Sequence, residues 1–309
     1  MKIAYLFPGQ GSQFAGMGKM LADEFPVAKE TFREADEALG FALSTLCFEG
    51  PEEDLKLTEN TQPALVATSV AALRVLRGLG APEPAFVAGH SLGEYSALVA
   101  AGSLDFADAL RLVRKRGQYM QAAVPPGVGA MAAILKMPSE ALDGVLAEAA
   151  QGEVVTAANF NSPDQIVIAG NKGAVDRAME LAKAAGAKRC VPLPVSAPFH
   201  CPLMKPAAEV MAEALSKVNV MSPVVPVIAN VTAATVVDTD EIRRLLVEQV
   251  TGMVRWRESV RVMKDAGVDM LIELGSGKVL SGLTKRIDGD LTGLSVGTPQ
   301  DIEDFLKKK

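Results

Sequence analysis

Apolar residues fall into two alternating patterns along the first part of the chain. Residues 2–7 (KIAYLF) and 85–90 (AFVAGH) are short apolar runs, which are typical of buried strands, and each leads into a turn that contains glycine. Helical spacing follows in four segments, namely 21–39, 64–79, 92–101 and a segment from an expected N-cap at Ser103 to about residue 123. Strand, glycine turn and helix in alternation predict an α/β sheet covered by helices.

Residues 128–195 show a different succession of patterns. Short β-type runs and helical segments alternate there in the order β-α-β-β-α-β, which is the order of the ferredoxin-like fold. Proline-rich joints flank the region, with Pro125 and Pro126 before it and Pro192, Pro194 and Pro198 at its end. We therefore expect residues 128–196 to form a ferredoxin-like subdomain, inserted into a larger α/β core that residues 1–127 and 197–309 build together.

After residue 196, strand-type and helix-type patterns alternate again, as they do at the start of the chain. The pattern predicts a helix over 202–218 and strands over 224–229 and 270–274, with two helices between these strands. Further helices and a last short strand are expected near the end, so this part can extend the first sheet.

The composition narrows the class of protein. Of the 309 residues, 49% are hydrophobic and 22% are charged, so the chain can bury a sizeable core. A net charge of −6 without a basic tract argues against nucleic acid or an anionic membrane surface as a partner. Cys47, Cys190 and Cys201 lack the spacing of a zinc site and the number for a disulfide framework. Because neither a signal peptide nor an apolar run of roughly 18 residues is present, we expect a cytoplasmic protein without a metal.

The sharpest local signal is the pentapeptide Gly89-His90-Ser91-Leu92-Gly93. It matches GxSxG, the nucleophile elbow, in which a serine occupies a strained turn between a strand and a helix. The apolar run before it and the helical segment after it supply the context that the motif requires. We therefore interpret Ser91 as a nucleophile, and a merely structural turn is the alternative.

A serine nucleophile requires a neighbouring base, and the chain contains only two histidines, His90 and His200. The side chain of His90 should diverge from that of Ser91, because the two residues are adjacent in the elbow. By elimination, His200 is the expected base, in a loop that enters a helix. Cys201 is a rival nucleophile, but it has no second histidine to serve it.

The oxyanion that forms on attack needs backbone N–H donors. Elbow geometry supplies one donor from Leu92, the residue after the nucleophile. The glycine-rich loop at residues 8–13 (PGQGSQ) is the expected source of the second donor. This loop lacks the GxxxxGK[ST] spacing, so it is not a P-loop.

Arg116 stands out by its position on the helix after Ser103. Arg111 and Lys115 fall on the solvent side of this helix, whereas Arg116 borders its apolar stripe and precedes Gly117. An inward guanidinium requires a carboxylate partner. That partner is either an Asp or Glu elsewhere in the fold or the free carboxylate of a substrate, and the pattern alone leaves both open.

Several collinear motifs together resemble one known family. They are LFPGQGSQ at the start, TQPALVATS at 61–69, GHSLGEYSAL at 89–98, the Arg116 helix, NFNSPDQIVIAG at 159–170, APFHCPLM at 197–204 and VEQV at 247–250. In this order they resemble the malonyl-CoA:acyl carrier protein transacylases, acyltransferases of fatty acid synthesis, over essentially the whole chain. The resemblance implies an α/β-hydrolase-like core with a ferredoxin-like insert.

The resemblance also implies a role for each matching residue. Ser91 would carry the acyl group, His200 would act as base and then acid, and Arg116 would bind the malonyl carboxylate. The backbone N–H groups of Gln10 and Leu92 would form the oxyanion hole. In this family a backbone carbonyl at the position of Gln249 orients the histidine, and Phe199 matches the malonyl-selecting form of polyketide acyltransferases.

The implied reaction is a ping-pong transfer of malonyl from malonyl-CoA to the phosphopantetheine thiol of acyl carrier protein. No cofactor is expected, and the protein is expected to be a monomer. Alternatives are a discrete acyltransferase that serves a polyketide synthase, a serine esterase or thioesterase, and a non-catalytic scaffold for acyl carriers.

Docking of an acidic carrier on an acidic chain needs a local basic patch. The candidates are Lys183, Lys188, Arg189, Arg255, Arg257 and Arg261. Ordinary solvated charge is the alternative reading of these residues.

Overall fold

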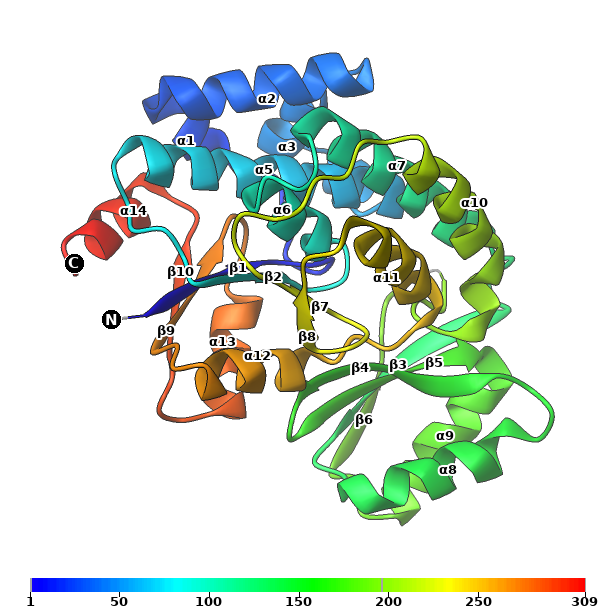
Figure 1. Ribbon diagram of the computed structural model, residues 1–309. Coiled ribbons are helices and arrows are strands. Elements are labelled where there is room, and N and C mark those ends of the chain that lie inside the picture. Colours follow the sequence, from blue (N-terminus) through cyan, green and yellow to red (C-terminus); the bar gives the residue numbers. More distant parts are fainter. Residues whose placement is uncertain (1, 196, 309) are drawn as a thin grey trace.

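The computed structural model describes residues 2–195 and 197–308, which form a mixed α/β structure with two separate sheets (Figure 1). The larger sheet has the order β10-β9-β1-β2-β7-β8, and all neighbouring pairs are parallel except β7 and β8. Its strands are β1 (Ile3–Phe7), β2 (Phe86–Gly89), β7 (Val227–Ala229), β8 (Ala234–Val236), β9 (Met270–Leu274) and β10 (Thr292–Val296). The expected strands at 2–7, 85–90 and 270–274 are thus confirmed.

Helices cover both faces of this sheet, as its largely apolar central strands require. The helices of the larger unit are α1 (Lys19–Glu24), α2 (Pro26–Leu39), α3 (Leu43–Glu49), α4 (Glu52–Leu55), α5 (Thr58–Gly78), α6 (Gly93–Ala100), α7 (Phe106–Ala122), α10 (Lys205–Ser216), α11 (Thr239–Thr251), α12 (Trp256–Asp265), α13 (Val279–Ile287) and α14 (Pro299–Leu306). On β1, Tyr5 and Phe7 belong to a core cluster under α5, α6, α7, α10 and α11, whereas Ala4 and Leu6 belong to a cluster under α12 and α13. Among the described residues, no helix has both the length and the apolar character needed to cross a membrane.

The smaller sheet is antiparallel, with the order β4-β5-β3-β6. Its elements follow the expected β-α-β-β-α-β succession: β3 (Gly129–Leu135), α8 (Leu142–Ala150), β4 (Val155–Ser162), β5 (Gln165–Asn171), α9 (Lys172–Ala184) and β6 (Arg189–Pro192). The two helices cover one face of this sheet (Figure 1). The expected boundary of the insert at residue 196 lies outside the described residues.

Three expected helix boundaries are wrong, each for a local reason. The helix predicted over 21–39 is two helices, because Phe25 is extended and Pro26 begins α2. The helix predicted from residue 64 starts at Thr58, where Gly117 of α7 packs closely on the backbone of Thr58 and Glu59, and it continues through Pro63. A helix C-terminal to Ser103 exists, but its N-cap is Asp105.

The N-cap of α7 and strand β8 are two features that the sequence pattern did not predict. The Asp105 carboxylate accepts the N–H groups of Ala107 and Asp108, whereas the Ser103 hydroxyl donates to the carbonyl of Met221 at 2.6 Å. Strand β8 was not expected, and it pairs with β7 along the sheet edge.

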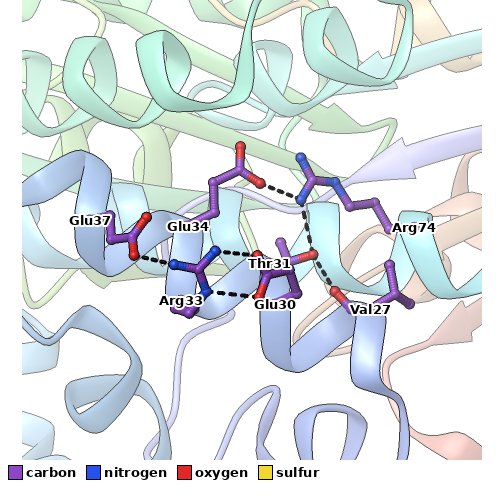
Figure 2. A network of polar contacts seen from close by, with 7 residues as sticks. All are labelled: Val27, Glu30, Thr31, Arg33, Glu34, Glu37 and Arg74. Atoms are coloured by element: carbon purple, nitrogen blue, oxygen red, sulfur yellow. Dashed lines mark hydrogen bonds and ion pairs between the residues drawn. The ribbon is translucent and has the colours of Figure 1, made fainter.

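A network of hydrogen bonds and ion pairs connects α2 to α5, and Figure 2 shows its residues. Arg74 of α5 donates to Glu34 at 2.6 Å and to the Thr31 hydroxyl at 3.2 Å, both on α2. Arg33 bridges Glu30 and Glu37 along α2 itself. These groups are partly or largely exposed, so each ion pair contributes little, and the apolar face of α2 supplies most of the attachment.

Candidate active site

Ser91 occupies the turn between β2 and α6 with a φ of 52°, in the left-handed region. The glycines on either side of the turn are required by space. A Cβ on Gly89 would lie 1.9 Å from the backbone of Gly93, and one on Gly93 would lie 2.2 Å from the carbonyl oxygen of Phe7. The backbone N–H of Ser91 donates to Oδ1 of Asn230 at 2.7 Å, which holds the strained turn.

Ser91 and His200 meet although 109 positions separate them in the chain: Ser91 Oγ lies 2.7 Å from His200 Nε2. The other ring nitrogen, Nδ1, lies 2.8 Å from the backbone carbonyl oxygen of Gln249. A carbonyl can only accept, so Nδ1 carries the hydrogen and Nε2 is free to accept the serine proton.

The Gln249 carbonyl is available because of its place in α11. The last four carbonyls of a helix have no partner within the helix, and α11 ends at Thr251. The same helix end carries partial negative charge, which stabilises a cationic imidazole. A helix terminus therefore takes the position that a carboxylate occupies in a serine protease triad.

His200 is buried, and its surroundings oppose protonation. Burial and, next, the nearby Arg116 guanidinium lower the pKa of His200 to about 3, while the hydrogen bond to the Gln249 carbonyl acts in the opposite direction. The imidazole is therefore neutral at neutral pH, as a base must be.

The two rival residues are engaged elsewhere. His90 Nε2 lies 2.8 Å from Oδ1 of Asn161, so its ring points away from the Ser91–His200 pair, as elbow geometry predicts. The Cys201 thiol donates to the carbonyl of Pro198, and burial raises the pKa of Cys201 to about 11. A thiol with this pKa is a poor nucleophile at neutral pH.

Arg116 is 1% exposed, and its guanidinium reaches the nucleophile. Nη2 donates to Ser91 Oγ at 3.1 Å and to Oε1 of Gln249 at 2.9 Å, while Nη1 donates to Oε1 of Gln62 at 2.9 Å. These acceptors are all neutral, and Nε has no partner among the described residues. No carboxylate in the described ranges forms a direct ion pair with Arg116, and Glu94, the nearby buried carboxyl group, is linked to the guanidinium only through the Gln249 amide.

The sequence analysis did not predict the side-chain amides that contact Arg116 and the Ser91 turn. The Gln249 side chain links the guanidinium to the Ser91 carbonyl, Gln62 accepts Arg116 Nη1, and Asn230 donates to the Gly89 carbonyl at 2.7 Å. Gln62 and Gln249 lie in the motifs TQPALVATS and VEQV, which were the available signal. Nothing in the local pattern around Asn230 indicates a role.

The residues expected to form the oxyanion hole lie beside the elbow. Leu92 precedes the first turn of α6, and the loop that carries Gln10 comes so close that a Cβ on Gly9 would lie 2.7 Å from the His90 carbonyl oxygen. Neither backbone N–H, of Gln10 or of Leu92, has an acceptor among residues 2–195 and 197–308. Both donors are thus available to a ligand.

The remaining expectations concern Phe199 and metals. Phe199 is buried in the larger core cluster, directly before His200. In the described part of the chain, no group of three or more His, Cys, Asp or Glu side chains could hold a metal ion. That no cofactor is needed stays a prediction.

Comparisons with known proteins show the family of the chain. The sequence model of the acyl transferase domain family matches residues 4–284. The chain is 52% identical to the malonyl CoA-acyl carrier protein transacylase of Escherichia coli K12, over 99% of both chains, and 52% identical to that of Bacillus subtilis, over 98% of this chain and 95% of the relative.

Solved structures give the same result. An acyl carrier protein S-malonyltransferase from Vibrio cholerae superposes with a TM-score of 0.97 and 53% identity, covering 98% of this chain and 99% of the other. A malonyl-transacylase in complex with a type II PKS acyl-carrier protein superposes with a TM-score of 0.98 and 48% identity, covering 100% of each chain. The chain therefore belongs to the acyl transferase domain family and, within it, to the malonyl CoA-acyl carrier protein transacylases.

Proposed function

We propose that this protein transfers the malonyl group of malonyl-CoA to the phosphopantetheine thiol of acyl carrier protein, for fatty acid biosynthesis, through an ester on Ser91. One observation carries the proposal. A buried guanidinium with only neutral partners lies 3.1 Å from the nucleophilic oxygen. A short acyl group on Ser91 that ends in a carboxylate would supply the missing negative charge, which a simple ester would not.

Binding of malonyl-CoA begins with this charge. The far carboxylate of the malonyl group pairs with Arg116 through two parallel hydrogen bonds and replaces the Ser91 hydroxyl as an acceptor. The thioester carbonyl is thereby positioned next to Ser91 Oγ. Binding and orientation are thus performed by the same residue.

Acylation follows from the Ser91–His200 contact. Ser91 Oγ attacks the thioester carbon while its proton moves to His200 Nε2, and the N–H groups of Gln10 and Leu92 bind the oxyanion. The tetrahedral intermediate expels CoA, which takes the proton from His200. A thiol with a pKa near 8.5 leaves far more readily than an amine, so a histidine oriented by a carbonyl suffices.

The second half of the reaction reverses these steps. The phosphopantetheine thiol gives its proton to His200 and attacks the Ser91 ester, and His200 returns the proton to Ser91 Oγ as malonyl leaves on the carrier. The overall reaction exchanges one thioester for another of similar energy, so the transfer is reversible. We assign to Phe199 a contribution to the selection of malonyl over branched malonates.

The proposal also includes the fold types of the core and the insert, the localisation and the oligomeric state of the protein. The core, from 1–127 and 197–309, is of the α/β-hydrolase-like type, and the insert over 128–196 is ferredoxin-like, which the sheet order β4-β5-β3-β6 supports. The protein works as a cytoplasmic monomer, without a metal or cofactor and without nucleic acid or membrane as a partner.

Intact-mass measurement after incubation with malonyl-CoA tests the proposal. The wild-type protein should gain one malonyl group, and Ser91→Ala should gain none. Arg116→Ala should be malonylated about 100-fold more slowly, because it loses the buried partner of the carboxylate, while its acylation by acetyl-CoA should persist. Wild-type protein without added mass would refute the proposed activity, as would equal malonylation of the Arg116 variant.

The identity of the carrier has a second candidate. The solved relative in complex with a type II PKS acyl-carrier protein is 48% identical to this chain. A carrier of polyketide synthesis is therefore the alternative acceptor for the same chemistry. Rates of malonyl transfer to purified carriers of each type would decide between them.

A further inference from the structure

Glu94 is a buried carboxyl group that the proposed chemistry does not use. It lies in the first turn of α6, three positions after Ser91, and it is 3% exposed. Its Oε2 accepts Gln249 Nε2 at 2.6 Å and the backbone N–H of Asn230 at 3.1 Å. Burial raises the pKa of Glu94 to about 7, although these two hydrogen bonds and the nearby Arg116 act in the opposite direction.

The Gln249 side chain joins Glu94 to Arg116. Its amide oxygen accepts Arg116 Nη2 at 2.9 Å, and its nitrogen donates to Glu94 and to the Ser91 carbonyl, the latter at 2.9 Å. If this amide turned over, its N–H groups would face the guanidinium and its oxygen would face Glu94. Both contacts would then be unfavourable, so Arg116 and Glu94 hold the amide in one orientation, together with the Ser91 carbonyl and Asn230 Oδ1.

We propose that Glu94 is a positioning residue that acts through the Gln249 amide on Arg116, and thereby sets how well the site accepts an acyl group that ends in a carboxylate. The inference rests on the proposed function and extends it to a residue outside the substrate's reach. Without the Glu94 acceptor, the amide nitrogen loses its shortest hydrogen bond and keeps only the Ser91 carbonyl at 2.9 Å and Asn230 Oδ1 at 3.3 Å, so the partner of the guanidinium is held less firmly.

The effect should be selective for charged acyl groups. Gln249 contacts His200 through its backbone carbonyl, and the helix backbone of α11 holds that carbonyl independently of the side chain. Loss of Glu94 therefore disturbs the guanidinium more than the base. An uncharged acyl group, which does not use Arg116, should be transferred to Ser91 nearly as before.

The experiment compares acylation of Ser91 by malonyl-CoA and by acetyl-CoA, followed by intact mass over time. In Glu94→Met, which keeps the volume and removes the acceptor, malonylation should fall about 10- to 100-fold with a higher KM for malonyl-CoA, and acetylation less than threefold. Glu94→Gln keeps an acceptor oxygen and should restore most of the malonylation. Glu94→Ala serves as the non-accepting variant if the Met variant does not fold.

A double-mutant cycle tests whether Glu94 acts through Arg116. In an Arg116→Ala background, Glu94→Met should reduce malonylation little further, because the group on which it acts is gone. Fully additive losses would overturn the proposal. So would equal losses of malonylation and acetylation in Glu94→Met, or a Glu94→Gln variant as slow as Glu94→Met.

Glu273 provides a matched control. It is also a buried carboxyl group, and it accepts the backbone N–H groups of Leu280 and Ser281 at the start of α13, away from Arg116. Glu273→Gln should change thermal stability and leave the ratio of malonylation to acetylation as in the wild type. Wild-type protein that takes no malonyl refutes the proposed function, whereas malonylated wild type with an unchanged ratio in Glu94→Met refutes this inference alone.

Discussion

Ser91 and His200 are two of the five non-glycine residues with positive φ in the described chain. Such a conformation costs about 1–3 kcal/mol at a residue, so surrounding contacts must compensate for it. At Ser91 the Asn230 side chain accepts the backbone N–H, and at His200 the Gln249 carbonyl holds the ring. The backbone strain lies where the two side chains must converge.

His90 gives a prediction about acid stability. Burial lowers the pKa of His90 below its ordinary 6.5, so in mild acid the unfolded chain binds a proton that the folded protein excludes. Stability from the neutral ring is therefore complete above pH 6.5 and is lost as the pH falls. His90→Gln retains a partner for Asn161 but does not titrate, so its unfolding free energy should fall less steeply below pH 6.5, by up to about 1.4 kcal/mol per pH unit.

Urea unfolding of both proteins between pH 5 and pH 8 measures this difference. The two curves should run parallel above pH 7. Equal slopes below pH 6.5 would show that His90 is protonated in the folded state.

At the scale of single residues, the sequence predicts the residues that react better than the residues that hold them in place. Ser91 has a spaced motif, His200 follows from the scarcity of histidine, and Arg116 follows from its place on a helix. Asn230 has no such signal, and Glu94 has only its place in GHSLGEYSAL, which does not indicate a role, because the importance of both depends on contacts made across the fold. An amide or a carboxyl group looks alike in sequence whether it is solvated or buried.

Two helix ends meet at the candidate site. The N-terminus of α6 presents the Leu92 N–H group, and the C-terminus of α11 presents the Gln249 carbonyl. The first end favours negative charge and the second favours positive charge. The pair matches the charges that develop on the oxyanion and on His200, without an added ion.

The turn between β2 and α6 yields a prediction at the scale of elements. Gly93→Ala would bring a Cβ within 2.2 Å of the Phe7 carbonyl oxygen, so β1 and α6 must separate. We expect a loss of several kcal/mol of stability and of most acylation activity. Gly144→Ala in α8 is the control, because no atom lies within 4 Å of the added Cβ and alanine favours a helix.

Thermal unfolding and malonylation rates of both variants check this expectation. The Gly144 variant should be as stable as the wild type or more so. A Gly93→Ala protein with wild-type stability would mean that the elbow can relax, contrary to the packing described above.

Helices and strands were predictable from the sequence where one local pattern of apolar residues determines them. Largely apolar runs indicated β1, β2 and β9, because strands buried on both faces have such sequences, although β9 also contains the buried Glu273. Helix ends were less predictable, because the break at Phe25 and the start at Thr58 depend on tertiary packing. The edge strand β8 is only three residues long and has no distinct pattern.

The insert, which comprises β3 to β6, contacts the larger unit close to the Ser91 elbow. Val254, just before α12, exchanges backbone hydrogen bonds with Ala158 and Phe160 of β4, and Asn161 of the same strand contacts His90. Arg286 of α13 pairs with Asp164 at 2.7 Å. The insert thus forms one wall beside the elbow, so a carrier that delivers its thiol there should also meet the insert.

The exposed cations of the insert lead to a prediction about the carrier. Lys183 pairs with Glu180, whereas Lys188 and Arg189 are exposed and form no ion pair within the described residues. Arg189→Glu should raise the KM for an acidic carrier about tenfold at low salt and leave the malonyl-CoA half-reaction unchanged. Lys29→Glu on α2, at the opposite end of the molecule from β6 (Figure 1), is the matched control.

Steady-state kinetics at two salt concentrations would separate these variants. The defect of Arg189→Glu should shrink as ionic strength rises. An unchanged KM for the carrier, or the same increase in Lys29→Glu, would place the docking surface elsewhere.

The hydrogen-bonded group around Ser91 has a consequence for how the protein refolds. Arg116, His200 and Gln249 come from distant parts of the chain, so no contiguous fragment contains a working site. Helical signal can return early during renaturation, because helix–coil relaxation takes only about 1 μs. Malonyl uptake should return only when both sheets have assembled, and it can therefore serve as a reporter of the final native contacts.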